Sequence, residues 1–252
     1  NGASALMQSE PFPAVLPLLI VQDQVIFPLS LAPLRITNQT EMKLIEDAAM
    51  GEKFVALLTG RNSEDVPSLE NAYEIGCIGR ILQLRRTPDG NMHVAIQALK
   101  RFRVAGLVNS EPYLTVRAEP LEEAPLDSND AAPLMMTLKM QMSRLIDLSP
   151  NVPDNASTVI ENIQDAGFLA DLAAANLNIL VEEKQRLLET LDRKQRLERI
   201  IYLVTREVEL MELSKKIQTN VKSTIDRSQR EYFLRQQMRA IQEELGEAGN
   251  ER

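Results

Sequence analysis

The sequence predicts an α+β protein in which a mainly β N-terminal lobe is followed by an all-α lobe that ends in a very long, partly exposed helix. All 13 prolines lie at or before Pro153. Residues 168–245 contain neither glycine nor proline, the two residues that most often interrupt helices. Residues 17–118 instead alternate short runs of Val, Ile, Leu and aromatic residues with turn formers, which is typical of strands.

The composition is that of a globular protein. With 252 residues, 44% of them hydrophobic and 25% charged, the chain can bury one or two ordinary cores. A net charge of -8 disfavours a dedicated surface for nucleic acid or anionic membranes, because clustered Lys and Arg dominate phosphate binding. The single cysteine, Cys77, excludes an internal disulfide framework and is typical of a reducing compartment. We therefore expect a cytoplasmic protein.

Neither a leader segment nor a membrane span is predicted. The first basic residue is Arg35, so the charged start of a signal peptide is missing. Residues 14–21, the longest apolar stretch near the start, are too few to span a bilayer. We expect residues 1–16 to be a disordered or cloning-derived start, with residues 1–6 as a cloning remnant ahead of a native start at Met7.

Residues 17–118 are predicted to form the β-rich lobe. The predicted strands cover residues 18–21, 54–59, 75–86, 91–104 and 113–118. The turn Pro88-Asp89-Gly90 predicts a hairpin, because proline fixes φ and glycine tolerates positive φ. Beyond that turn Met92, Val94 and Ile96 share one face of the second arm.

One helix interrupts the predicted strands, and a linker follows them. Asn38 and Glu41 have the spacing of a capping box, and Gly51 marks the end of this helix. Residues 119–133 mix acids, prolines, Ser and Asn without periodicity, which indicates a linker. Residues 134–252 are then predicted to form the helical lobe.

The helical lobe is predicted to begin with a helix that ends before Pro150, because proline disfavours helix in the residue before it. Asp165 is a candidate N-cap for a later helix, and Thr190 or Asp192 for the last one. The predicted helices after Pro150 cover residues 156–163, 166–175, 181–189 and about 192–245.

The last helix, which we call the rod, would be about 80 Å long at 1.5 Å per residue, more than a small domain can cover. We expect it to have a packed root, a solvated shaft and an apolar tip. The apolar residues of these three parts are Leu197, Ile201, Val204, Val208 and Met211 in the root, Ile217, Val221 and Ile225 in the shaft, and Leu234, Met238, Ile241 and Leu245 in the tip.

No catalytic, cofactor-binding or metal-binding residue is predicted. The sequence has no Gly-rich phosphate loop followed by Lys and Ser or Thr. His93 is the only histidine and is expected at the surface, and Cys77 is expected to be a buried, inert thiol. One His and one Cys cannot form a zinc site. Most carboxylates lie on helix faces or in the linker, where solvated charge is the ordinary explanation.

Two clusters leave alternatives open. The first is Met135, Met136, Met140 and Met142, for which core filling is favoured over an adaptable apolar surface. The second is a concentration of positive charge on and near the hairpin. With few aromatic residues to stack bases, a nucleic-acid platform is only a minor interpretation of that cluster, which consists of Arg85, Arg86, Lys100, Arg101 and Arg103.

Several segments resemble the N-terminal region of the Lon family of ATP-dependent proteases, in the same order along the chain. The tract at residues 228–247, SQREYFLRQQMRAIQEELGE, is the most specific of them. The resemblance covers nearly the whole chain from about residue 17. The other matching segments are residues 17–28 (PLLIVQDQVIFP), 73–84 (YEIGCIGRILQL), the Pro88-Asp89-Gly90 hairpin, 165–172 (DAGFLADL) and 183–189 (EKQRLLE).

The resemblance implies a β lobe of the PUA-like kind joined to a helical lobe and a long helix. In the family that helix leads into an AAA+ ATPase module, which uses ATP and Mg, and then into a protease module with a Ser-Lys dyad; the whole assembles as a homohexamer. No position here matches the Walker motifs or the dyad, so no catalytic residue is carried over. Residues 30–32 depart from the residues that many relatives have there.

The function implied by the resemblance is substrate recognition and assembly within an ATP-dependent serine protease. Such enzymes degrade misfolded, damaged and short-lived regulatory proteins in quality control and the stress response. We expect this region to capture unfolded or degron-bearing proteins and to position them without doing chemistry. The candidate contacts are Leu29, Leu31, Tyr232, Phe233 and Met238. For the rod residues, packing between protomers or against the ATPase module is the favoured alternative.

Two other functions remain open at this point. The chain could be a self-standing protein-binding module or coiled-coil scaffold that never joins an ATPase. It could also tether DNA, a weaker interpretation that uses Arg85, Arg86, Arg101 and Arg103.

Overall fold

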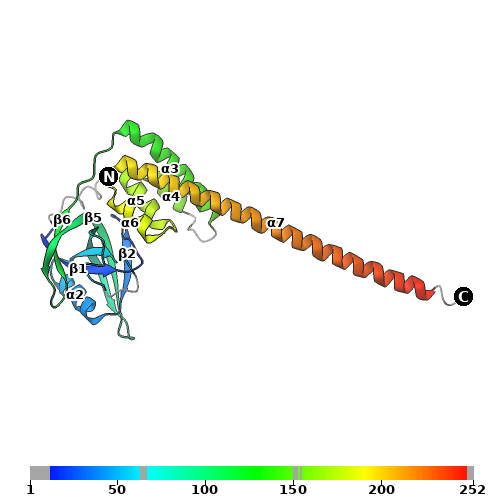
Figure 1. Cartoon of the computed structure of the whole chain (residues 1–252), viewed down its shortest axis with the longest axis horizontal. Coiled ribbons are helices and arrows are strands. Elements are labelled where there is room, and N and C mark those ends of the chain that lie inside the picture. Colours follow the sequence, from blue (N-terminus) through cyan, green and yellow to red (C-terminus); the bar gives the residue numbers. More distant parts are fainter. Residues whose placement is uncertain (1–11, 63–66, 150–152, 154, 249–252) are drawn as a thin grey trace.

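The computed structural model describes residues 12–62, 67–149, 153 and 155–248. Figure 1 shows a β lobe, a helical lobe beside it, and one long helix that leaves the helical lobe and continues alone. This is the predicted α+β arrangement. Of the predicted disordered or cloning-derived start at residues 1–16, residues 1–11 lie outside the described residues, including the predicted cloning remnant at residues 1–6. The prediction is wrong for Val15 and Leu16, which belong to a strand because they pair with the last strand of the sheet.

The β lobe is a six-stranded sheet with the strand order β2-β5-β4-β3-β1-β6. Because β5 also pairs with β6, the sheet closes into a barrel from which β2 is left out as an edge strand. β1 and β3 pair in parallel, and the other strand pairs are antiparallel. The strands are β1 (Val15–Val21), β2 (Leu31–Ile36), β3 (Phe54–Thr59), β4 (Ile75–Arg86), β5 (Met92–Asn109) and β6 (Thr115–Pro120).

The long strand β5 explains how the barrel closes. One edge of β5 pairs with β4, whereas the other edge pairs first with β2 and then with β6. The β2 segment ends at the pair Leu31 and Gln97, and the β6 segment begins at Phe102 and Pro120. Hence β2 and β6 follow one another along the same edge.

The predicted hairpin is confirmed. Thr87 N donates to the Asn91 carbonyl at 2.9 Å, and Gly90 has a φ of 80°. Met92, Val94 and Ile96 are buried, as their shared face predicts. The bounds of β3 and β4 are also those predicted from the sequence.

Two strands at the start of the chain differ from the prediction. β1 begins at Val15 rather than at residue 18, because it pairs with β6 on the N-terminal side of its contact with β3. β2 was not predicted, since Pro33 in its middle argues against a strand. Proline is tolerated there because β2 is an edge strand and has a partner on one side only.

The helix between β2 and β3, α2 (Gln39–Met50), begins after the predicted cap residue Asn38 and ends at the predicted Gly51, but the capping box predicted with Glu41 is not formed between these described residues. The Asn38 side chain accepts a hydrogen bond from Thr40 N at 2.8 Å. At the other end Gly51 N donates to the carbonyls of Asp47 and Ala48. Leu44 and Ile45 of α2 are buried in a hydrophobic cluster that also includes residues of the helical lobe, so the two lobes share a core.

The helical lobe contains α3 (Ser128–Leu148), α4 (Ala156–Asn162), α5 (Ala166–Asn176), α6 (Val181–Glu189) and the long helix α7 (Arg193–Ala248). The predicted linker at residues 119–133 is too long, because β6 reaches Pro120 and α3 begins at Ser128. The Asp127 side chain caps α3 by accepting from Asn129 N, and Pro133 lies inside the helix, in its second turn.

The methionine cluster on α3 is divided between the core and the surface. Met142 is buried and Met135 packs against the core, so core filling is correct for these two. It is wrong for Met136 and Met140, which are 75% and 60% exposed. The reason is the helix period: α3 covers the core with one face and presents the opposite face to solvent.

The rod is the continuous helix α7. The predicted cap is confirmed, because Asp192 Oδ1 accepts from Lys194 N and Gln195 N at 2.9 and 3.0 Å. The root packs against α3 and α5. Because two helices cover the root, its buried face is wider than the predicted row of apolar residues. The buried residues are Leu197, Ile200, Leu203, Val204 and Val208, whereas the predicted Ile201 and Met211 are half-buried.

Candidate functional site: the groove between the two lobes

A groove of about 270 Å³ lies where the two lobes meet. Its apolar wall comes from the turn before β2, from β5 and from α5. Its polar wall comes from the connection between the lobes and from the first turn of α7. The lining residues are Pro28, Leu29, Leu99, Lys100, Arg101, Leu121, Glu122, Glu123, Asp165, Gly167, Phe168, Asp171 and Arg193.

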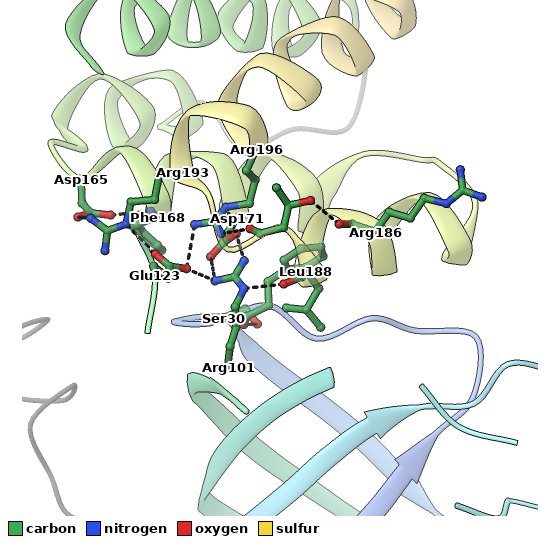
Figure 2. Close-up of polar contacts among 12 residues, drawn as sticks. Ser30, Arg101, Glu123, Asp165, Phe168, Asp171, Arg186, Leu188, Arg193 and Arg196 are labelled. Atoms are coloured by element: carbon green, nitrogen blue, oxygen red, sulfur yellow. Dashed lines mark hydrogen bonds and ion pairs between the residues drawn. The ribbon is translucent and has the colours of Figure 1, made fainter. Parts of the chain in front are cut away.

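Arg101 extends from β5 into the helical lobe and is 2% exposed (Figure 2). Its Nη1 and Nη2 atoms donate to the two carboxylate oxygens of Asp171 on α5, at 2.9 and 2.6 Å. Its Nε donates to the Leu188 carbonyl at the end of α6, at 2.8 Å. A bidentate pair of this kind fixes both distance and orientation. Arg101 therefore joins the β lobe to two helices of the other lobe.

The same carboxylates also hold the root of α7. Glu123, in the connection between the lobes, accepts hydrogen bonds from Arg101, Arg193 and Arg196. Arg196 is fully buried, and its Nε lies 3.3 Å from Asp171 Oδ1 as an ion pair. We call these five residues, Arg101, Glu123, Asp171, Arg193 and Arg196, the interlobe network. It couples the β lobe to the direction in which the rod leaves the protein.

Burial and the neighbouring charges shift the pKa values of Arg101 and Glu123 in opposite directions. Burial alone lowers the pKa of Arg101, but the attraction of Asp171 and Glu123 outweighs it and raises the pKa above the ordinary value. Cys77, which pairs with Arg101 across β4 and β5, is fully buried, and this burial raises its pKa to about 12. The thiol is thus inert in the folded protein, as predicted for Cys77.

The interlobe network makes the stability of the folded protein depend on pH. Burial tends to raise the pKa of Glu123, but Arg101 and Arg196 lower it below the ordinary value. A carboxylate with a lowered folded-state pKa contributes stability that is complete above its unfolded pKa of about 4.3 and is lost as the pH falls through the folded value. We expect urea unfolding at pH 7, 5 and 3.5 to show this loss below about pH 4.

The Glu123→Gln variant is the control for this prediction. It should be less stable than the wild type at pH 7, and its stability should fall by less between pH 5 and pH 3.5. Identical pH dependence in the two proteins would show that Glu123 does not contribute in this way.

Sequence reasoning did not find the interlobe network. It placed Arg101 in a basic surface cluster, which is wrong, because Arg101 is buried among its carboxylate partners. A signal was present in α5, whose sequence AGFLADLAAAN carries Asp171 as its single charged residue. A lone acid in an apolar helix indicates a buried partner, since an unpaired buried charge is too costly.

The burial of Arg101 also weakens the DNA-tether interpretation. Arg86 pairs with Glu46, and Lys100 pairs with Glu122. The proposed cluster is therefore divided between the interior and acidic partners. Arg85 and Arg103 are exposed, whereas the other three have acidic partners, which leaves less basic surface than the five residues suggest.

The turn before β2 places two of the predicted contacts close together. Leu29 lines the groove, and Leu31, at the start of β2, is 60% exposed. Leu29 has a φ of 62°, a conformation that costs a non-glycine residue free energy. Strain of this kind at an exposed apolar turn is consistent with a functional contact.

The other predicted contacts lie on α7, in the part that continues beyond the helical lobe (Figure 1). Tyr232, Phe233 and Met238 are all more than half exposed. Successive helix residues are about 100° apart, so these three side chains point in three different directions. No single flat partner can contact all of them.

Among the described residues, no group of three or more His, Cys, Asp or Glu is arranged to hold a metal ion. Within the same residues, no helix is both long enough and apolar enough to cross a bilayer.

The chain matches, over residues 15–206, the family model of the ATP-dependent protease La (LON) substrate-binding domain. The chain belongs to the Lon protease family. The resemblance seen in the sequence is thereby confirmed, and the match identifies this region as a Lon N-terminal substrate-binding domain.

Curated Lon relatives align with almost the whole chain. The Lon protease of Dictyoglomus thermophilum is 38% identical over 242 residues, which cover 96% of this chain and 31% of the relative. Lon protease 2 of Myxococcus xanthus is 38% identical over 244 residues, which cover 96% of this chain and 30% of the relative. The chain thus spans about a third of the length of these relatives.

Solved Lon N-terminal domains show the same fold. The N-terminal domain of Mycobacterium avium complex Lon protease aligns with a TM-score of 0.62 at 23% identity, covering 76% of this chain and 98% of that domain. The Lon N-terminal domain protein from Xanthomonas campestris aligns with a TM-score of 0.56 at 18% identity, covering 75% of this chain and 97% of that protein.

Proposed function

We propose that this substrate-binding domain captures exposed apolar segments of unfolded or damaged proteins through the turn that carries Leu29 and Leu31. The observation that carries the proposal is the position of this turn, where the strained Leu29 lines the groove and the exposed Leu31 follows two residues later. Apolar side chains held on a rigid element lose little entropy on binding, so they are suited to capture.

The domain works as part of an ATP-dependent serine protease that assembles as a homohexamer in the cytoplasm. In this proposal ATP and Mg act in an ATPase module outside these 252 residues, and the rod relays captured chains toward it. The relatives named Lon protease are about three times as long as the matched region, which supports the proposal that other modules carry out ATP hydrolysis and proteolysis. Tyr232, Phe233 and Met238 of the rod then contact neighbouring modules or protomers.

Substitution of Leu29 tests this proposal. The Leu29→Gly variant should have about the stability of the wild type, because the strain relieved at a φ of 62° offsets the greater freedom that glycine gives the unfolded chain. It should nevertheless bind a permanently unfolded, reduced and alkylated protein several-fold more weakly, since the apolar contact is lost. Binding is measured by fluorescence anisotropy of the labelled unfolded protein, and stability by urea unfolding.

Leu31→Ser combined with Leu29→Gly should weaken binding by about tenfold. The matched control is Leu107→Ser, which removes a leucine that is 51% exposed on β5 and does not line the groove. Equal loss of binding in the control and the double variant would contradict the role given to this turn.

A further inference from the structure

Strand β2 has one edge without a partner among the described residues. It lies at the end of the strand order and pairs on its other side with β5. An unpaired strand edge presents a row of backbone donors and acceptors that can pair with another chain. The barrel closure between β5 and β6 leaves β2 outside, so closure does not cover this edge.

The register identifies the residues whose backbone groups face outward. Ala98 N donates to the Ser30 carbonyl at 2.9 Å, next to the pair Leu31 and Gln97. In an antiparallel ladder the directly opposed residues alternate between hydrogen-bonded and non-hydrogen-bonded pairs. The even-numbered residues of β2 therefore bond to β5. Leu31, Pro33 and Arg35 direct their backbone groups toward the open edge.

The open edge is held rigid by the side chains between these positions. Ala32, Leu34 and Ile36 are buried in the core, so the strand has a fixed register. Leu31 and Arg35 are exposed on the opposite face. A chain that pairs with this edge does not have to order β2 first, which lowers the entropic cost of binding.

Pro33 limits how strongly the edge can pair. Leu31 and Arg35 each offer an N–H and a carbonyl, whereas Pro33 offers a carbonyl alone. Proline in an edge strand is a common protection against permanent edge-to-edge association. Here it removes one donor and leaves the remaining groups available, so the edge is suited to weak, reversible pairing.

We propose that β2 binds a segment of unfolded polypeptide as an added strand. This inference rests on the proposed function and specifies how the substrate is held. Main-chain hydrogen bonds do not depend on sequence, so an edge of this kind accepts many different chains. Leu31 supplies an apolar contact at one end of the edge, and Leu29 continues it into the groove. The occupant is therefore an extended segment with apolar residues at alternate positions.

A set of three peptides tests the strand pairing. The probe is a blocked hexapeptide of alternating Val and Thr, either unmodified, N-methylated on its three Val residues, or N-methylated on its three Thr residues. The N–H groups of alternate residues point to opposite edges of a strand, so each modified peptide loses the donors of one edge. We expect one modified peptide to bind about tenfold more weakly than the unmodified one, and the other to bind within about threefold.

Variants of β2 in the full chain give a second readout. Arg35→Pro removes the outward N–H of residue 35, and Arg35→Ala is its matched control, because it removes the same charge and keeps that N–H. Peptide binding should be several-fold weaker for Arg35→Pro than for Arg35→Ala. Pro33→Val restores a donor at the edge and should tighten binding several-fold. Circular dichroism verifies that each variant keeps the wild-type fold.

The outcomes separate this inference from the proposed function. If the unfolded protein binds in a Leu29- and Leu31-dependent manner but both N-methylated peptides bind equally, capture by the turn stands and strand pairing is wrong. If the wild-type chain binds no unfolded protein, both proposals are wrong. If Pro33→Val forms dimers in sedimentation and does not gain affinity for the peptide, the edge pairs with a second copy and the inference is wrong.

Discussion

Replacement of Asp171 with asparagine is expected to lower the free energy of unfolding by about 3–5 kcal/mol, the cost of removing one partner from a buried ion pair. Asp171 is shared by two fully or almost fully buried guanidinium groups, those of Arg101 and Arg196. Without its charge, three arginines would share the single carboxylate of Glu123. The remaining positive charge would be buried without compensation.

The matched control is Glu212→Gln, which removes one partner from the exposed ion pair with Arg144. This variant should lose no more than about 1 kcal/mol, as is usual for surface pairs. Both are compared by urea unfolding at pH 7. An equal, small loss in the two variants would mean that the network does not hold the lobes together.

The reactivity of Cys77 provides an independent test of the destabilisation expected for Asp171→Asn. Its thiol is buried beside Arg101 and has a pKa of about 12, so it should resist alkylation at pH 8 in the folded wild type. In the Asp171→Asn protein, alkylation should be faster, because loss of the network allows the lobes to separate and expose β4. Hydrogen exchange then reports which lobe opens first.

The Gly76→Ala variant is expected to lose at least about 3 kcal/mol of stability or to fail to fold. A Cβ atom at residue 76 would lie 2.0 Å from the Leu57 carbonyl oxygen and 2.8 Å from Leu58 Cδ2. The Leu57 oxygen belongs to the backbone of β3, which pairs with β4 at Cys77. Relief of the clash therefore requires separation of two central strands of the barrel.

Gly106→Ala is the control for this second prediction, because a Cβ atom there would have no neighbour within 4 Å. Its stability should stay the same or rise by up to about 1 kcal/mol, since alanine restricts the unfolded chain. Thermal unfolding of both variants, followed by circular dichroism, makes the comparison. A Gly76→Ala protein with wild-type stability would show that the two strands can separate without cost.

The elements predicted correctly from the sequence are those whose turn and cap residues are compatible with the tertiary structure around them. The hairpin at Gly90, the capped helix after Asn38 and the helix that begins at Asp192 were all found, because turn and cap residues act over a few positions. β2 was missed because Pro33 argues against a strand. Only the tertiary structure shows that this strand lies at an edge, where proline is tolerated.

The candidate site was predicted only in part. Leu29 and Leu31 were predicted as contacts from their place in an apolar turn; Leu29 lines the groove and Leu31 is exposed, while their role stays a prediction. The partners of Arg101 were not identified, because Glu123 and Asp171 are 22 and 70 residues away in the sequence. Local patterns carry no information about such contacts. The arginine therefore resembled an ordinary surface charge.

The unaccompanied length of α7 makes the rod a lever. From the first turns of α7 to its end, residues 196–248 extend about 80 Å at 1.5 Å per residue, so a rotation of about 5° there displaces the far end by about 7 Å. The fulcrum of this lever is the first turns of α7, where Arg193 and Arg196 bond to Glu123. A small rearrangement of side chains between the lobes thus moves the distant end of α7 by more than the length of a side-chain contact.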